Sequence, residues 1–259
     1  MSADTAKICA LILAGTRPGV ADPMAQAAGV SHKAILPVDG IPMISRVIST
    51  LRNTPEVGRI VVCIDNADVL KEVVLPDTDI IAARPEGPSA SVMAGLRELG
   101  APLLVTTADN ALLRPEWITE FLNKASPAAD LSVAVAAKDN VLRDVPLTKR
   151  TFIHLSDLSF SGCNLFLLRS DRSANIVKLW QHIEKNRKHP LRIAWLLGVF
   201  TLIRALCKQL SRAALYARLK KMTGAQAELV CLNDGRAAVD VDKPADLILT
   251  ERLLRESRP

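Results

Sequence analysis

Aromatic side chains are scarce in this sequence and make up only 3% of its 259 residues. Proteins that bind single-stranded nucleic acid stack bases on such side chains, and no recognition-helix motif is evident. The formal net charge of +6 is also unevenly distributed, because residues 182–221 hold ten Lys or Arg and one acid, a local charge of +9 that leaves −3 elsewhere. We therefore expect no nucleic-acid partner.

Paired cysteines and clustered histidines are missing too. The sequence has no C-x-x-C motif and no cysteine near a ligand-like histidine, so we expect neither a zinc site nor a disulfide framework. His154, His182 and His189 lack carboxylate or serine partners in the pattern and are expected to be structural. The scattered cysteines fit a reduced, cytoplasmic protein. Because the segment of residues 1–7 is short and polar, we expect no secretory signal. The five cysteines stand at positions 9, 63, 163, 207 and 231.

Apolar segments alternate with amphipathic ones along the chain, which is typical of an α/β domain with a mostly parallel twisted sheet in three layers. We predict a single domain over residues 1–259 that carries a basic, amphipathic helical insert at 182–224. Residues 138–150 are polar and are expected to form a flexible excursion over the site. Predicted strands cover residues 8–13, 59–64, 78–82, 101–107, 131–137, 152–155 and 158–168. Predicted helices cover residues 42–51 and 89–99, and two further helices are predicted to begin at Pro115 and at Pro244.

The loop after the first strand is the first candidate site. Gly15, Pro18, Gly19 and Pro23 oppose regular structure for about ten residues, and small side chains let backbone N–H groups approach a phosphate. Its cations are Arg17 and Lys33. The loop has neither the Walker sequence nor the G-x-G-x-x-G fingerprint. The alternative is a plain strand-to-helix connection with solvated charges.

Acidic residues near two later segments form the second candidate site. Asp109 follows a predicted central strand, and because Pro115 fits the first position of the next helix, with Arg114 as its cap, Asp109 has no capping role. Asp240 and Asp242 are predicted to share one face of a strand, although Asp242 also lies near the cap of the last helix. Carboxylates in such places suit Mg²⁺.

Two further segments allow two interpretations each. Ser89 is a natural N-cap for the helix that follows it, and it either only caps the helix or also contacts a nucleotide. Gly162 lies in a predicted bend where Asn164 could reach an acceptor substrate, or where the chain makes a plain bulge.

Three segments resemble the MobA-like nucleotidyltransferases, a branch of the GT-A-like sugar-nucleotide pyrophosphorylase superfamily. They are residues 11–43, 86–113 and 237–247. The first holds L-A-G-x-R from Leu13 to Arg17 and K-x-x-L-P-V-x-G-x-P-M from Lys33 to Met43, and the last reads A-A-V-D-V-D-K-P-A-D-L. The middle segment holds a Gly-x-x-x-Ser stretch after Glu86 and the aspartate Asp109. The chain departs from the family pattern at Thr16, where glycine is usual, and at Lys243 and Ala245 in the closing segment. The resemblance implies a GT-A or Rossmann-like nucleotidyltransferase fold.

The resemblance also implies a reaction, in which an NMP unit passes from an NTP to a phosphate monoester with release of pyrophosphate. By this carry-over Lys33 and Arg17 stabilise phosphates, Asp109 and Asp240 bind Mg²⁺, and Asp242 is a weaker ligand candidate. The expected substrates are CTP or GTP and a polyol, sugar or lipid-headgroup phosphate. Alternatives are a glycosyltransferase of the same fold and a non-catalytic membrane-docking protein. The expected nucleotide contacts are Leu13, Ala14, Gly15, Thr16, Gly87, Ser89 and Asp109, and the expected acceptor contacts are Gly162 and Asn164.

The insert is the most basic part of the sequence. Its uncharged run from Ile193 to Ile203 has eleven residues, too few for a membrane span of about twenty. Arg204, Lys208 and Arg212 recur every four residues, which predicts one basic helical face beside apolar residues. Such a helix either lies on anionic lipid at the inner face of the cytoplasmic membrane or packs on the domain or on a second copy in a homodimer.

Overall fold

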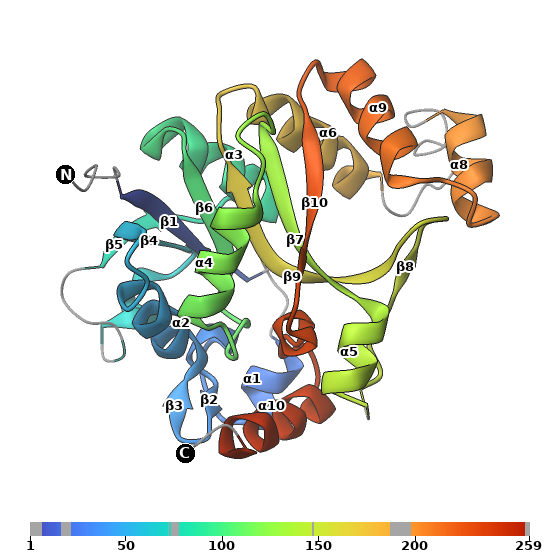
Figure 1. The fold of residues 1–259 in the computed structure, drawn as a ribbon. Helices are drawn as coiled ribbons and strands as arrows, with labels where there is room; N and C mark the ends of the chain where they lie inside the picture. The colour runs from blue at the N-terminus through green and yellow to red at the C-terminus, as the bar shows by residue number, and fades with distance from the viewer. Residues whose placement is uncertain are drawn as a thin grey trace, which may run out of the picture.

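A mixed sheet forms the centre of the computed structural model, which describes residues 7–16, 22–71, 73, 78–146, 148–186 and 198–256. Its strands follow the order β10-β7-β9-β6-β1-β4-β5, with β8 paired to β9 (Figure 1). β9 is antiparallel to β6, β7 and β8, whereas the other pairs are parallel. The expectation of a mostly parallel α/β sheet is confirmed. The strands are β1 (Ile8–Leu13), β4 (Val57–Ile64), β5 (Asp79–Ala82), β6 (Leu103–Thr107), β7 (Leu131–Ala137), β8 (Ile153–His154), β9 (Ser159–Leu168) and β10 (Ala227–Leu232).

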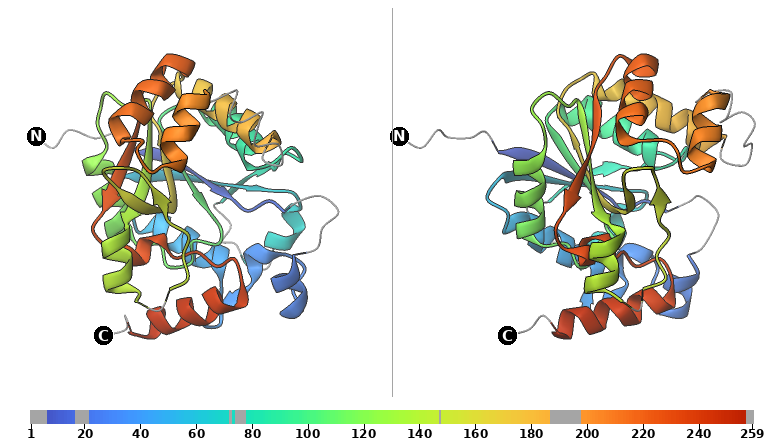
Figure 2. Two further views of the ribbon diagram at one scale, coloured as in Figure 1. Left: turned by 90° about the vertical axis from the view of Figure 1, so that its right-hand side faces the viewer. Right: turned by 45° about the vertical axis from the view of Figure 1, so that its right-hand side comes forward.

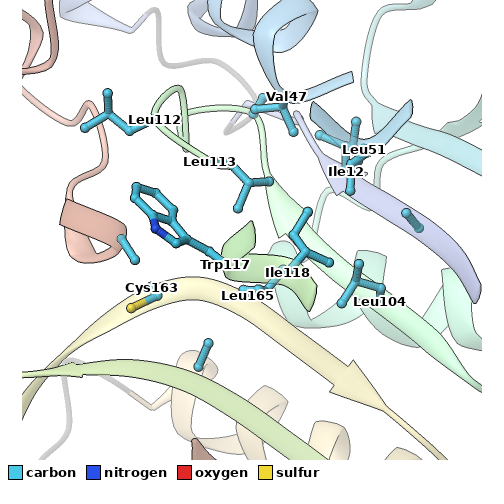
Figure 3. Packing of buried hydrophobic residues seen from close by; sticks show 14 of the residues in the cluster. Ile12, Val47, Leu51, Leu104, Leu112, Leu113, Trp117, Ile118, Cys163 and Leu165 are labelled. Carbon is cyan, nitrogen blue, oxygen red and sulfur yellow. The ribbon is translucent and has the colours of Figure 1, made fainter. Parts of the chain in front are cut away.

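Helices cover both faces of the sheet, which gives three layers (Figure 2). On one face Ile12 packs with residues of α2 (Met43–Arg52) and α4 (Pro115–Lys124). On the other face Leu11 packs with residues of α3 (Pro88–Leu99) and α6 (Ser173–Lys185). Neighbouring strand residues point to opposite faces, so this division follows from the strand geometry. Figure 3 shows Trp117 and Ile118 of α4 among side chains from β1, β6 and β9.

The strand order reverses beside β1. After β1 the chain builds β4 and β5 on one side and then returns to form β6 on the other. Leu13 pairs in register with Thr107, and the N–H of Ala108 donates to the carbonyl of Leu13 at 2.9 Å. In open α/β sheets, ligands bind at the carboxyl ends of strands where the order reverses. The segments after β1 and β6 therefore lie where a site is expected.

Short elements lie between the main strands and helices. Helix α1 (Pro23–Ala27) begins where the carboxylate of Asp22 accepts hydrogen bonds from two backbone N–H groups, so the irregular loop ends earlier than expected. Residues 138–144 form helix α5 (Lys138–Asp144), so the expectation of a flexible excursion over 138–150 is wrong for that part. A 3₁₀ turn (Lys33–Ile35) and the hairpin of β2 (Pro37–Val38) and β3 (Ile41–Pro42) precede α2, and α10 (Pro244–Glu256) ends the described chain.

The described part of the insert contains two helices, α8 (Val199–Leu206) and α9 (Arg212–Thr223). Lys208 between them has a left-handed φ of 56°, which no α-helix contains. Arg204, Lys208 and Arg212 therefore do not share one helical face, and that prediction is wrong. Leu210 is buried in a cluster with Val135 of β7 and Phe160 of β9, which attaches the insert to the sheet. Within the described ranges, no helix has both the length and the apolar character that a membrane crossing needs.

Candidate active site

The turn after β1 is packed closely against its neighbours. A Cβ atom on Gly15 would lie 2.7 Å from the Cβ of Ala83, so only glycine fits without a shift of the backbone. Thr16 donates from its backbone N at 2.9 Å and from its hydroxyl at 2.7 Å to the two carboxylate oxygens of Asp65. Asp65 comes directly after β4, so this contact fixes the turn to the neighbouring strand.

His32 links the same carboxylate to the segment before Lys33. Its ring is buried, Nε2 lies 3.2 Å from Oδ1 of Asp65, and Nδ1 accepts the N–H of Ala34 at 3.1 Å. Because Nδ1 accepts, the ring holds its proton on Nε2 and donates it to Asp65. Burial raises the pKa of Asp65, but hydrogen bonds from Thr16 and His32 outweigh it and leave that pKa lowered. Asp65 therefore ties both ends of the loop together as an ionised carboxylate.

Lys33 connects two distant acidic segments. Its Nζ lies 3.0 Å from Oδ2 of Asp109 and 3.0 Å from Oδ1 of Asp242. Burial lowers the pKa of Lys33, but the two carboxylates outweigh burial and raise this pKa to about 12. The hydroxyl of Thr107 donates to the other oxygen of Asp109 at 2.6 Å, which fixes the orientation of that carboxylate. Lys33 is thus a fixed cation at the carboxyl end of β6.

Asp240 has its own set of partners. Both terminal nitrogens of Arg150 donate to its Oδ1, at 2.5 and 2.6 Å, and Nδ2 of Asn164 donates to its Oδ2 at 2.7 Å. Burial raises the pKa of Asp240, Arg150 lowers it, and the carboxylates of Asp242 and Asp109 raise it again, to about 6. The three carboxylates are therefore close enough to affect one another's charge.

A bulge in β9 directs Asn164 to this cluster. Pairing with β7 shifts between Val133 and Val135, and Asn164 adopts a left-handed φ of 49°. The bulge interpretation is thus confirmed, and the bulge is also what brings the amide to Asp240. Whether Gly162 and Asn164 bind an acceptor stays a prediction.

The closing acidic segment is a loop and not the predicted strand. It follows a 3₁₀ turn (Gly235–Ala238), and the N–H of Val241 donates to the carbonyl of Asp109 at 3.1 Å. One oxygen of Asp246 in α10 accepts the N–H groups of Asp242 and Lys243, each at 3.2 Å. Side-chain caps therefore hold the loop in place. The alternation of apolar and acidic residues in the sequence does not distinguish such a loop from a strand.

A cavity of about 350 Å³ collects most of the predicted nucleotide contacts. Its wall also includes His32 and Met43. Arg17 lies outside the described residues. The predicted site residues that line this cavity are Leu13, Ala14, Gly15, Thr16, Lys33 and Asp109.

Gly87 and Ser89 lie apart from that cavity wall. Gly87, and not Ser89, is the N-cap of α3, so the capping prediction for Ser89 is wrong. Ser89 is buried, and its hydroxyl donates to the carboxylate of Glu184 in α6. Its contact with a nucleotide stays a prediction.

Sequence reasoning missed Asp65, His32 and Arg150. Asp65 follows β4 as Asp109 follows β6. Both residues therefore lie at the carboxyl end of a parallel strand, where ligands are expected, and the sequence could have indicated Asp65 for the same reason. His32 adjoins Lys33 but lacks a recognisable partner in the sequence. Arg150 lies ninety positions from Asp240, and only the tertiary structure brings them together.

The chemistry of the carboxylates fits a divalent cation. Three acids share two cations, Lys33 and Arg150. The pKa of Asp240 is raised mainly by burial, and the neighbouring carboxylates raise it further. Among the described residues, however, no three His, Cys, Asp or Glu side chains converge as a metal site. Mg²⁺ commonly takes only one or two carboxylates and completes its shell with phosphates and water. That Asp109 and Asp240 bind Mg²⁺ stays a prediction.

Known proteins resemble this chain in both sequence and fold. A family model described as the MobA-like NTP transferase domain matches residues 10–229. A hypothetical transferase from Thermus thermophilus has 28% identity and a TM-score of 0.80, covering 93% of this chain and 99% of that one. No curated protein matches the chain.

Two solved synthetases share the fold at lower identity. CMP:2-keto-3-deoxy-manno-octonic acid synthetase complexed with CTP has 14% identity and a TM-score of 0.57, covering 97% of this chain and 100% of that one. 4-Diphosphocytidyl-2C-methyl-D-erythritol synthase from Anaerococcus prevotii has 13% identity and a TM-score of 0.56, with the same coverage.

Proposed function

The chain belongs to the MobA-like NTP transferase family, and we propose that it joins an NMP unit from an NTP to a phosphate-monoester acceptor and releases pyrophosphate. The observation that carries this proposal is the position of Lys33. Its ammonium group lies on the wall of the cavity after β1, between the carboxylates of Asp109 and Asp242. A cation fixed there can bind the α-phosphate and stabilise charge that develops on the leaving pyrophosphate.

The proposed reaction needs positioning more than proton transfer. The oxygen of an ionised phosphate monoester attacks the α-phosphorus of the NTP, the bond to the β-phosphate oxygen breaks, and pyrophosphate leaves. An ionised phosphate is already a nucleophile, so no general base is required. The protein must hold two anions against each other, which requires fixed cations and backbone donors.

We assign the nucleotide to the cavity lined by Leu13, Ala14, Gly15 and Thr16, where the backbone turn is fixed by Asp65. Gly87, Ser89 and Arg17 complete the proposed nucleotide contacts. Asp109 and Asp240 are the proposed Mg²⁺ ligands. When bound, Mg²⁺ would neutralise phosphate charge and orient the triphosphate. CTP and GTP are the proposed nucleotides.

Release of pyrophosphate tests the proposal. Purified protein is incubated with CTP or GTP, Mg²⁺ and a panel of polyol, sugar and lipid-headgroup phosphates. We expect pyrophosphate release that Asp109→Asn lowers by about 10³-fold or more and that a chelator abolishes. Asp79→Asn, in an exposed ion pair with Arg59, is the matched control and should keep full activity. Full activity of Asp109→Asn, or release of NDP from a sugar nucleotide instead, would contradict the proposal.

We also propose that the insert docks the enzyme on an anionic membrane surface, so that the acceptor is a lipid headgroup or its precursor. Phe200, Ile203 and Leu206 project from α8 and are 85%, 50% and 74% exposed. Residues 198–224 contain no acid and six Lys or Arg. Exposed apolar side chains beside basic ones suit an interface with anionic lipid.

A further inference from the structure

Arg150 makes an unusual contact with Asp240. Arginine commonly pairs with a carboxylate through two parallel hydrogen bonds to its two oxygens. Here both terminal nitrogens donate to Oδ1 alone, while Oδ2 is taken by Asn164. The Nε of Arg150 is buried and has no hydrogen-bond partner among the described residues. The guanidinium is therefore fixed beside the carboxylate cluster, and its buried Nε–H donor has no partner within the described part of the chain.

The division of charges around the cluster leaves Arg150 for the second substrate. Among the described side chains, Lys33 and Arg150 are the cations that contact Asp109, Asp240 or Asp242. Lys33 lines the cavity assigned to the nucleotide, whereas Arg150 does not line it. Arg150 instead meets the cluster beside Asn164 of β9. A phosphate monoester needs a cation to approach three carboxylates, and Arg150 is placed for that task.

Gly162 on β9 is open on its side-chain face. A Cβ atom there would meet no heavy atom within 4 Å. Asn164 lies two residues further along the same strand.

We propose that Arg150 binds the phosphate of the acceptor, exchanging its contact with Oδ1 of Asp240 for bidentate contacts to two phosphate oxygens. Asn164 keeps Asp240 in place during this exchange through its hydrogen bond to Oδ2. This inference rests on the proposed transfer to a phosphate monoester, and it assigns the residue that selects that class of acceptor.

Binding of inorganic phosphate, the simplest probe of such a subsite, tests the inference. The wild-type protein is saturated with a non-hydrolysable α,β-methylene analogue of CTP or GTP and Mg²⁺, and phosphate is then titrated and followed by ³¹P NMR. We expect Arg150→Gln to weaken phosphate binding by about 10-fold or more and Arg150→Lys to weaken it less, because lysine keeps the charge but not the fork. The affinity for the nucleotide analogue should change less than about twofold.

Arg59→Gln is the matched control, since it removes an arginine from an exposed ion pair with Asp79 and should leave both affinities unchanged. Circular dichroism and thermal melting of each variant verify folding. Loss of phosphate and nucleotide binding together in Arg150→Gln would show a structural role and overturn the inference. Phosphate binding that is absent in the wild type, or unaffected by Arg150→Gln, would overturn it as well. Failure of the wild type to bind the nucleotide analogue would instead overturn the proposed function.

Discussion

The Nζ of Lys33 lies 3.0 Å from Oδ1 of Asp242, although 209 positions separate the two residues in the chain. The same nitrogen contacts Asp109, which follows the central strand β6. One ammonium group thus joins the beginning, the middle and the end of the chain at one edge of the sheet.

Replacing Lys33 by methionine removes the cation and leaves the side-chain volume similar. The carboxylates of Asp109 and Asp242 then lose their shared partner, and phosphate charge in the cavity is no longer compensated. We expect pyrophosphate release to fall by about 10²- to 10³-fold. Steady-state kinetics measure this fall, with Lys71→Met as the control because Lys71 is in an exposed pair with Asp68. A drop below about tenfold would remove the proposed role of Lys33.

The pKa of Asp240 predicts a specific dependence of stability on pH. In the folded protein it is raised from 3.8 to about 6, so the folded state binds the proton more tightly than the unfolded state. The contribution of Asp240 to stability is therefore full below pH 4 and is lost as the pH rises through 6. In the wild type, Asp240 should lower the free energy of unfolding by up to about 3 kcal/mol between pH 4 and pH 7. We expect this decrease to be absent in Asp240→Asn.

Urea denaturation between pH 4 and pH 7 measures this difference. Other acids, such as Asp65 with its lowered pKa, contribute the opposite slope and remain in both proteins. The comparison of wild type with Asp240→Asn therefore isolates one group. Parallel pH profiles of the two proteins would show that Asp240 titrates at its ordinary value.

Adding one methyl group to Gly15 tests the turn after β1. The new Cβ atom would lie 2.7 Å from the Cβ of Ala83, so the turn or its neighbour must move. We expect Gly15→Ala to lower the free energy of unfolding by about 1–3 kcal/mol and to weaken nucleotide binding. Gly162→Ala is the control for stability alone, since its Cβ meets no atom within 4 Å. Chemical denaturation and nucleotide titration measure both effects, and equal stability of the two variants would contradict the packing argument.

Charged substitutions on α8 test the membrane surface. The double variant Phe200→Glu, Leu206→Glu removes two exposed apolar side chains and opposes the local positive charge. We expect sedimentation with phosphatidylserine-containing vesicles to weaken by about tenfold or more, and wild-type binding to fall with added salt. Ile248→Glu, at an exposed apolar position of α10, is the matched control. Wild-type protein that stays in the supernatant, or a double variant that binds as the control does, would contradict membrane docking and favour packing on protein.

Local patterns predicted the main elements of the fold. The apolar runs that become β1, β4, β6 and β7 have the length and branching of buried strands, so their positions follow from the sequence. Pro115 set the start of α4, with Arg114 as its cap. Helix α5 was missed because polar residues alone do not separate a helix from a loop. The closing segment alternates like a strand but forms a loop, because side-chain caps hold it and no described strand pairs with it.

The sequence by itself determined the α/β class and the family resemblance, and it marked Lys33 and Asp109 as candidate site residues, because strand ends and short motifs are local features. Only the tertiary structure decided which charges meet. It joined Lys33 to Asp242, Arg150 to Asp240, and Asp65 to both Thr16 and His32. These pairs lie between 33 and 209 positions apart, and their contacts depend on how strands from distant segments are ordered in the sheet. The sequence gives the charge of each side chain, but the folded topology determines which charges are in contact.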